Sequence, residues 1–328
     1  YLGIISGFSL WFKKVEESYA RMSVNNVLIN RMRTALHMKN RMHHGSGVKL
    51  DQKEITITFD HVSFSYPNQD RNILDDVSFT LHAGQKLALV GANGAGKSTI
   101  VKLILGFYTP SAGSIYINGT DICELDLDDL YTHITGIFQD AVMLSYSIAE
   151  NVSMQDITDT DLQRVKDCLK RSGLWEFIFA LPQQELTHIG KDIEEDGIQL
   201  SGGQKQKLFM ARALYRDFGC LLLDEPTTYL DIAHQLEILE LLRDLNREEQ
   251  TTIILVIHDL NQAAKFADHV IGMKQGRALY CGKAQEVIRE QQLLQLYDIH
   301  AKIVQDEEHG YPICMDYALH KHTDIPEH

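Results

Sequence analysis

The spacing of hydrophobic residues along the chain changes character near residue 48. Residues 15–42 carry an apolar stripe at intervals of three and four, with Lys and Arg on much of the opposite face, which predicts a helix. Residues 43–47, HHGSG, have the composition of a flexible joint. From residue 55 the stretch ITITFDHVSFSY alternates between apolar and polar positions, and this period of two predicts half-buried strands.

The apolar run YLGIISGFSLWF at residues 1–12 has two interpretations. A membrane-spanning helix needs about 20 apolar residues, so this run alone is too short to cross a bilayer. It is either the cut end of a longer transmembrane helix, which we favour, or a short buried helix.

Beyond residue 80, short apolar runs alternate with helical patterns. The runs LALV, CLLLD and IILVIH have the composition of buried strands, and the spacing predicts helices at 158–180 and 203–216. This alternation predicts an α/β fold whose mostly parallel sheet is covered by helices on both faces. The tail, residues 286–328, predicts a helix followed by a hairpin formed by AKIV and PICMD.

Charge and cysteine content exclude some classes of protein. The chain has 328 residues and a formal net charge of -14, from 31 basic and 45 acidic residues. A protein that coats nucleic acid is usually basic, so we expect no nucleic-acid partner. The five cysteines are scattered without a CxxC spacing, which indicates reduced thiols rather than disulfides or a zinc site.

The stretch GANGAGKST directly follows the apolar run LALV and precedes a helical pattern. Its Gly-x-x-x-x-Gly-Lys-Ser spacing, between a strand and a helix, is that of a phosphate-binding loop. Glycines let the backbone curl so that N–H groups point inward, and the helix adds its positive N-terminus. The predicted nucleotide-binding residues here are Gly91, Asn93, Gly94, Ala95, Gly96, Lys97, Ser98 and Thr99.

Two acidic residues complete the chemistry that such a loop requires. Asp224 ends the buried run CLLLD, and Glu225 follows it. We expect Lys97 to reach the β- and γ-phosphates, and Ser98 and Asp224 to hold Mg²⁺. Glu225 is placed to act as general base on the attacking water.

The stretch LSGGQKQK, at residues 200–207, resembles the signature motif of ABC-transporter ATPases. Together with the phosphate loop, Gln139, the Asp-Glu pair and His258 in the order of that family, the resemblance covers roughly residues 55–285. It implies a P-loop NTPase fold with a parallel-sheet core, an antiparallel β subdomain and an α-helical subdomain at about 140–216. It also implies ATP and Mg²⁺ as cofactors.

The resemblance implies a role for each matching residue. Ser201, Gly202 and Gly203 of one copy would contact the γ-phosphate held by a second copy, and Asp231 would cross that interface. Gln139 resembles the glutamine that senses Mg²⁺ and water, and His258 resembles the histidine that contacts the γ-phosphate. Tyr66 in FSYP resembles the aromatic residue that stacks on adenine. The expected catalytic residues are Glu225, His258, Gln139 and Lys97, and the expected metal ligands are Ser98, Gln139 and Asp224.

Two branches of the family are represented in one chain. Residues 1–216 resemble exporters, in which the ATPase is fused behind membrane helices, and Thr187–Gly190 resemble a loop specific to exporters. Residues 220–328 resemble ATPase subunits that import iron-siderophore, haem or cobalamin. A recombined or designed chain would explain the pattern, and so would an under-sampled natural branch.

The sequence thus predicts three parts: a linker helix at 1–47, the ATP-binding domain at 48–285, and a helix-hairpin extension at 286–328. We expect an ATPase that powers transport by closing a dimer, either of two copies or with a paired ABC subunit. Its other partner would be a transmembrane permease domain, and the chain itself would be membrane-associated, at the cytoplasmic face of the cell membrane. Exporter-type coupling is favoured over an importer subunit, and a soluble ABC ATPase or a non-catalytic nucleotide-binding module is the alternative class.

Overall fold

The computed structural model describes residues 47–67, 69, 71–190, 197–228 and 230–319. All of them belong to one unit of the chain, His43–His328. The predicted linker helix and the apolar run before it lie outside the described residues. Within the described part, no helix combines the length and the hydrophobicity that a bilayer crossing requires.

A six-stranded sheet with the order β10-β9-β3-β8-β7-β6 carries the centre of the fold. Neighbours from β9 to β6 pair in parallel, while β10 is an antiparallel edge strand. Every residue of β7 and β8 is buried, which explains why these strands are apolar almost throughout. The strands are β3 (Lys86–Gly91), β6 (Ile134–Ile137), β7 (Cys220–Asp224), β8 (Thr252–Val256), β9 (His269–Lys274) and β10 (Arg277–Gly282).

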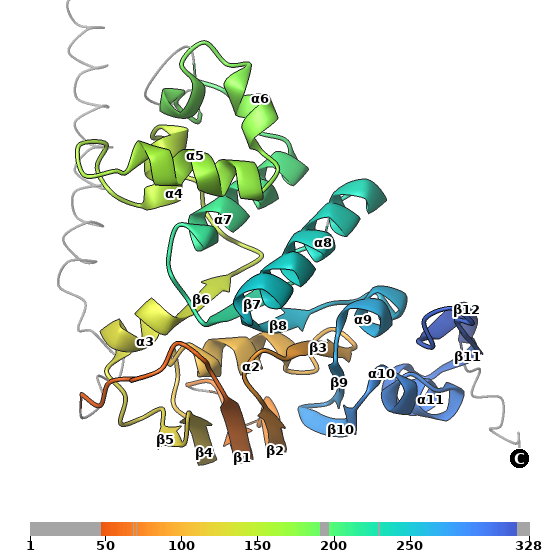
Figure 1. Cartoon of the computed structure of the whole chain (residues 1–328). Coiled ribbons are helices and arrows are strands. Elements are labelled where there is room, and N and C mark those ends of the chain that lie inside the picture. Colours follow the sequence, from red (N-terminus) through yellow and green to blue (C-terminus); the bar gives the residue numbers. More distant parts are fainter. Residues whose placement is uncertain (1–46, 68, 70, 191–196, 229, 320–328) are drawn as a thin grey trace, which may run out of the picture. The chain divides into compact units, whose positions relative to one another are not determined.

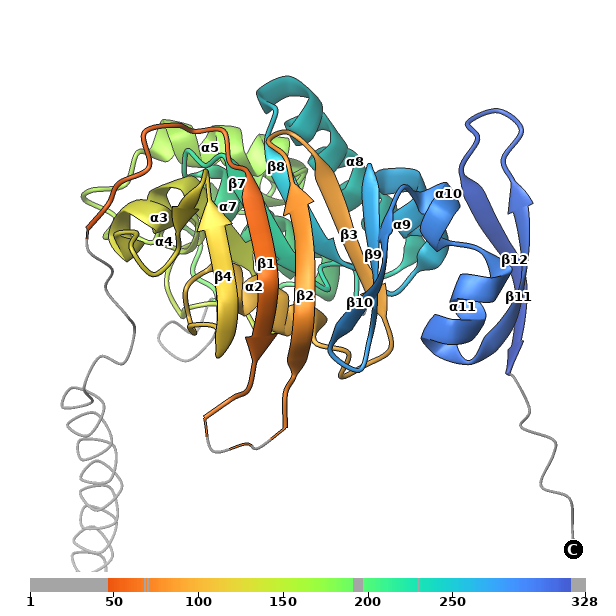
Figure 2. The same cartoon turned by 90° about the horizontal axis from the view of Figure 1, so that it is seen from below.

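An antiparallel sheet with the order β2-β1-β4-β5 forms a second layer, whose strands β4, β1 and β2 lie side by side in Figure 2. Phe59 and Phe79 stack across the β1–β2 pair with ring centroids 4.6 Å apart. Buried and more exposed residues alternate along β1 and β2, as the period of two predicts, except at Asp60–His61 and Asp75–Asp76, near which the pairing register shifts. The strands are β1 (Ile57–Phe64), β2 (Leu74–Leu81), β4 (Ala112–Ile117) and β5 (Thr120–Asp121).

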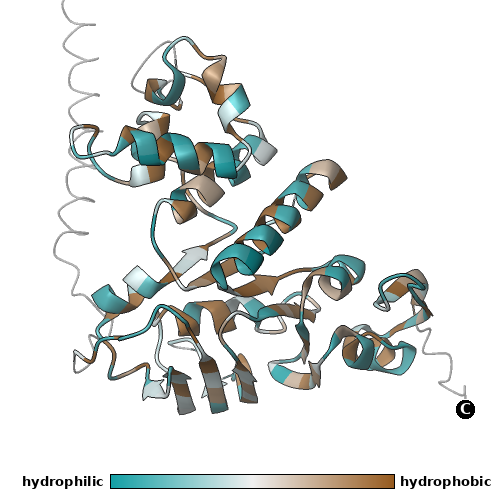
Figure 3. Ribbon diagram, viewed as in Figure 1, coloured by the Kyte–Doolittle hydropathy of each residue, from teal (hydrophilic) through white to brown (hydrophobic). Residues whose placement is uncertain are grey.

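Helices cover the central sheet and form a group of their own between β6 and β7. In that group α4 and α5 pack on α7, and α5 buries Val165, Cys168 and Leu169 while its polar residues face outward (Figure 3). The helices are α2 (Lys97–Ile104), α3 (Leu127–His133), α4 (Ile148–Ser153), α5 (Leu162–Arg171), α6 (Trp175–Phe179), α7 (Gly202–Leu214), α8 (Ile232–Glu249), α9 (Leu260–Phe266), α10 (Ala284–Val287) and α11 (Glu290–Tyr297), with a 3₁₀ turn, η1, at Gln184–Leu186. The predicted mixed α/β fold, with parallel and antiparallel sheets and a helical region, is confirmed (Figure 1).

The last described elements are a hairpin of β11 (Ile299–Gln305) and β12 (Pro312–Leu319). Helix α11 contacts both β9 and β11, and β12 packs on α9. None of the five cysteines, all of which lie within the described residues, is paired in a disulfide. Cys314, on β12, belongs to the same hydrophobic cluster as residues of β7, β8 and the helical group.

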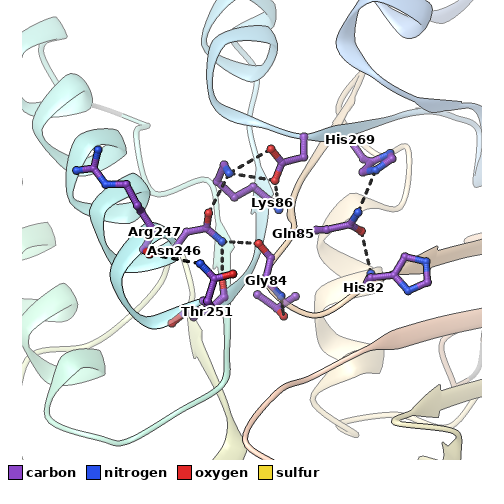
Figure 4. A network of polar contacts seen from close by, with 11 residues as sticks. His82, Gly84, Gln85, Lys86, Asn246, Arg247, Thr251 and His269 are labelled. Atoms are coloured by element: carbon purple, nitrogen blue, oxygen red, sulfur yellow. Dashed lines mark hydrogen bonds and ion pairs between the residues drawn. The ribbon is translucent and has the colours of Figure 1, made fainter.

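A polar network holds the start of the central strands together (Figure 4). The Lys86 ammonium donates to Asn246 Oδ1 at 2.9 Å and to both oxygens of Asp268. The Asn246 amide donates to the carbonyls of Gly84 at 2.7 Å and Thr251 at 2.8 Å. Asn246 is only 7% exposed and Thr251 is 1% exposed, so the bond between them lies out of water and loss of the amide would leave the Thr251 carbonyl without this partner.

We therefore expect Asn246→Leu to lower the free energy of unfolding by about 2–3 kcal/mol, because it leaves buried polar groups unpaired at similar volume. Urea unfolding of the nucleotide-free chain measures the effect. Arg247→Leu is the matched control on the same helix. Its ion pair with Asp244 is exposed, so its loss should cost less than about 1 kcal/mol. Equal losses in the two variants would contradict a structural role for the network.

Candidate functional site

The predicted phosphate loop lies at the carboxyl end of β3 and curls on three glycines. Gly91, Gly94 and Gly96 have φ angles of 145°, 76° and 98°, a region that L side chains rarely adopt. A Cβ on Gly91 would lie 2.1 Å from the Met273 carbonyl oxygen, so no other residue fits without a shift. Gly96 is the N-cap of α2, and it has no side chain that could accept from the first N–H groups of the helix. Its first N–H groups are therefore open to an anion.

Lys97 lies inside the curl rather than in solvent. It is 4% exposed, and its ammonium donates to the carbonyls of Gly91 at 2.7 Å and Ala92 at 3.0 Å. Burial lowers the pKa of Lys97, while the carboxylates of Glu225 and Asp224 act in the opposite direction. The loop therefore holds a cation that can leave its two carbonyls for a stronger, anionic partner.

Ser98 and Asp224 meet at the start of α2. The Ser98 hydroxyl donates to Asp224 Oδ1 at 2.9 Å, and Asp224 is 7% exposed. Burial raises the pKa of Asp224, and the hydrogen bond from Ser98 opposes that rise. A hydroxyl and a carboxylate side by side are oxygen donors of the kind that Mg²⁺ prefers, so this pair fits the predicted metal.

Glu225 and His258 form a second pair beside the loop. His258 Nε2 lies 2.7 Å from Glu225 Oε1, and the Thr228 hydroxyl donates to Glu225 Oε2 at 3.2 Å. Glu225 also has a φ of 54°, an unusual conformation for a residue with a side chain. Residues held in such conformations cluster at functional sites, where the surrounding structure fixes them.

Ser98, Glu225 and His258 border one cleft of about 700 Å³, which is within the range of small-molecule sites. Tyr66 lies at one side of it, with its hydroxyl 3.2 Å from Thr99 Oγ1 and its ring edge-on to those of Phe64 and Tyr108. The cleft brings together most of the residues predicted from the sequence: Tyr66, Asn93, Gly94, Ala95, Gly96, Lys97, Ser98, Thr99, Gln139, Glu225 and His258.

Six predicted residues do not line this cleft. Two of them, Gly91 and Asp224, lie next to it through their contacts with Lys97 and Ser98, and the other four are Ser201, Gly202, Gly203 and Asp231. Ser201 is the N-cap of α7, where its side chain and that of Gln204 form a capping box next to Gly202 and Gly203. Asp231 is the N-cap of α8, with its carboxylate bonded to His234 at 2.8 Å. A Cβ on Gly203 would lie 2.5 Å from His234 Cδ2, so the starts of these two helices are in contact. The predicted site residues therefore form two separate groups in one chain.

The sequence analysis missed two residues that border the cleft, Thr228 and Ile73. For Thr228 a signal existed, because a hydroxyl three residues after the predicted general base can reach its carboxylate. Ile73 carries no chemical group that a sequence pattern would single out.

Comparisons with known proteins show which family this chain belongs to. The profile of the ABC transporter family matches residues 74–228. Over 262 residues the chain is 37% identical to the iron(3+)-hydroxamate import ATP-binding protein FhuC of Bacillus subtilis, covering 77% of this chain and 92% of that protein. It is 36% identical to the ATP-dependent lipid A-core flippase of Burkholderia pseudomallei, covering 75% of this chain but only 40% of the flippase.

A solved bacterial Atm1-family ABC exporter with ATP bound has a similar structure, with a TM-score of 0.67 and 32% identity. The alignment covers 78% of this chain and 43% of the exporter chain. A P-loop ATPase fold with a phosphate loop, a buried Asp-Glu strand end and a helix-capping Ser-Gly-Gly turn defines the class of protein. The chain belongs to the ATP-binding proteins of ABC transporters, whose members couple ATP hydrolysis to transport.

We expect Lys97→Met to weaken ATP affinity by about a hundredfold, because a buried charge-assisted contact to phosphate is lost while the side-chain volume is kept. Titration with a fluorescent ATP analogue measures this. Lys170→Met, which removes an exposed lysine, is the control and should bind as the unchanged chain does. An affinity for Lys97→Met within threefold of the control would contradict the assigned cradle.

Asp224→Asn should make the nucleotide-free chain more stable at neutral pH. Because burial raises the pKa of Asp224 in the folded chain, its ionisation costs stability as the pH rises through that value. The variant should melt a few degrees higher than the unchanged chain at neutral pH, and the difference should vanish below about pH 4, where both states are protonated.

Asp51→Asn, at an exposed position, is the control and should not change the melting temperature. A melting temperature for Asp224→Asn at or below that of the unchanged chain at neutral pH would show that ionised Asp224 does not strain the fold.

Proposed function

We propose that this chain is the motor domain of a transporter in which two ATP molecules are enclosed between two facing ATP-binding domains. The observation that carries the proposal is the division of the site. Lys97, Ser98, Glu225 and His258 surround the cleft, whereas Ser201–Gly203 and Asp231 lie elsewhere in the chain. A second copy, or a paired ABC subunit, would supply the missing group to each cleft.

The second group has the properties required for that role. Gly203 is buried, yet Ser201 and Gly202 are exposed. The N-terminus of a helix carries free N–H groups and a partial positive charge, which favour a phosphate. The capping box fixes the start of α7, so the amides are preorganised for an anion that a facing domain presents.

In hydrolysis, each residue of the cleft acts at a different atom. Lys97 would exchange its two loop carbonyls for the β- and γ-phosphate oxygens. Glu225 would accept a proton from the attacking water, and His258, already in contact with Glu225, would contact the γ-phosphate. Gln139, an exposed residue beside the cleft, would orient the same water.

Ser98, Asp224 and Gln139 are the residues that would hold Mg²⁺. When bound, the ion would neutralise charge that develops on the phosphate oxygens. Tyr66 would stack on adenine, for which its ring is already fixed by Phe64 and Tyr108.

We further propose that this chain lies at the cytoplasmic face of the cell membrane, where a helix of the membrane domain docks in an apolar groove on its surface. The groove has a volume of about 350 Å³, and Phe107, Tyr131, Phe138 and Phe209 line it between the central sheet and α7. Its position directly beside Gln139 would connect docking to the hydrolytic site.

The groove also favours exporter-type coupling. All residues that line it lie between Leu105 and Arg216, the part of the chain that resembles exporters. The loop at Thr187–Gly190, which resembles an exporter-specific loop, also supports exporter-type coupling. The Thr187 carbonyl accepts a hydrogen bond from the Ile148 amide, and the Ile189 amide donates to the Tyr146 carbonyl. These bonds tie the loop to the segment that follows Gln139.

An importer subunit is the second candidate, supported by length. The chain covers 92% of FhuC and 96% of the achromobactin transport ATP-binding protein CbrD of Dickeya dadantii. Sequencing the gene around this segment separates the two. Membrane helices encoded upstream in the same frame favour export, whereas a separate permease gene with a binding-protein gene beside it favours import.

We expect Glu225→Gln to keep ATP affinity, reduce phosphate release by about a thousandfold, and trap a dimer with Mg-ATP, because closure persists when the base is absent. Phosphate release and light scattering during gel filtration measure the two effects. Glu240→Gln, an exposed change on α8, should hydrolyse ATP and form no trapped dimer. Monomeric Glu225→Gln under saturating Mg-ATP would overturn the two-domain site.

A further inference from the structure

One side chain connects the C-terminal hairpin to the helix that follows His258. Asn261, on α9, accepts from the Cys314 amide at 2.7 Å and donates to the Cys314 carbonyl at 3.2 Å. Within the described residues, β11 is the only strand that pairs with β12. The asparagine amide therefore takes the place of a neighbouring strand on the free edge of β12.

Asn261 is fixed at the same time to the start of its own helix. Its backbone amide donates to Asp259 Oδ1 at 2.8 Å, as does that of Gln262 at 2.9 Å, and Asp259 is the N-cap of α9. Only Asp259 and Leu260 separate Asn261 from His258. A shift of the start of α9 would therefore move His258 relative to Glu225.

The hairpin can act as a support because it is anchored to the central sheet independently of α9. Lys274 of β9 donates to the Gln295 carbonyl at 2.6 Å and to the Asp298 carboxylate at 3.0 Å, at the end of α11. Leu296 is fully buried against Gly272 of β9, where a Cβ would lie 2.7 Å from its Cδ1. Strand β11 begins at Ile299, directly after Asp298, so these contacts fix the position of the hairpin relative to the central sheet.

A second connection leads from α9 to the segment after Glu225. The side-chain amide of Gln262 donates to Gln235 Oε1 at 2.7 Å. Gln235 in turn donates to the carbonyls of Leu230 at 2.9 Å and Thr227 at 3.2 Å. The start of α9 thus lies between two supports, the hairpin through Asn261 and the loop that follows Glu225 through Gln262.

We infer that Asn261 is a positioning residue, which holds His258 against Glu225 by fastening the start of α9 to the C-terminal hairpin. Asn261 lies outside the set of residues that line the nucleotide cleft, so it acts through His258 and not on the nucleotide. The inference rests on the proposed function, in which His258 contacts the γ-phosphate.

Asn261→Leu tests the inference because it keeps the volume and removes both bonds to Cys314. We expect kcat for ATP hydrolysis to fall about tenfold through the displaced histidine, while the affinity for an ATP analogue with Mg²⁺ stays within about twofold. Lys265→Leu, an exposed change on the same helix, is the matched control and should alter neither quantity.

Two further measurements show whether Asn261 acts through His258. In a His258→Ala background, Asn261→Leu should cause no additional loss of kcat, because the residue that it positions is gone. Without nucleotide, the ¹³C-labelled imidazole signal of His258, identified by its absence in His258→Ala, should shift in Asn261→Leu and stay in place in Lys265→Leu.

Each failure has its own signature. An additive loss in the His258→Ala background, or an unchanged His258 signal in Asn261→Leu, overturns the positioning role and leaves the nucleotide site intact. Full turnover by His258→Ala contradicts the proposed role of that histidine. The imidazole signal then still decides whether Asn261 holds it in place.

Discussion

The burial of one ammonium group inside a curl of backbone is the constraint on which the site depends. Lys97 is 4% exposed, and its ammonium donates to the carbonyls of Gly91 and Ala92. That contact keeps the loop curled before any nucleotide arrives, so binding requires little reorganisation. Two carboxylates nearby, Glu225 and Asp224, favour the charged lysine although burial opposes it. The loop that leads to Lys97 follows β3, and the two carboxylates lie at the end of β7, so the parallel sheet holds these two segments close to each other.

This arrangement lowers the stability of the folded chain, and the unfavourable groups lie at the carboxyl edge of the central sheet. Burial disfavours the ionised form of Asp224 and so raises its pKa, and Glu225 occupies a left-handed backbone conformation. Strands β7 and β8 are fully buried along their length, and the opposite ends of β3, β8 and β9 are joined by the network around Lys86 and Asn246. A rigid sheet of this kind can hold a few unfavourable groups at one edge without losing its structure.

Local patterns in the sequence were sufficient for the fold class and for most of the cleft. Strands such as CLLLD are apolar because both faces are covered, and the glycine spacing of the loop follows from its backbone angles. The contacts between distant segments were beyond those patterns. Neither the Glu225–His258 pair nor the bonds from Asn261 to Cys314 follows from local spacing, because each depends on how strands of the sheet or the hairpin are placed. Thr228 is an intermediate case. Its spacing of three residues from Glu225 could be read from the sequence, but only the structure shows that its hydroxyl contacts the Glu225 carboxylate.

The two family resemblances within the chain meet in a single packed interior. Leu208 and Phe209, from the exporter-like part, share one hydrophobic cluster with Leu221, Ile238 and Cys314 from the importer-like part. Packing of this kind requires matching volumes on both sides, so the two parts behave as one domain rather than as two joined pieces. In the proposed function, the residues that bind ATP would have the same chemical task in either branch. A difference in transport direction would then arise at the surface that meets the membrane domain, and the proposed docking groove between β6 and α7 is lined by residues that precede Asp217.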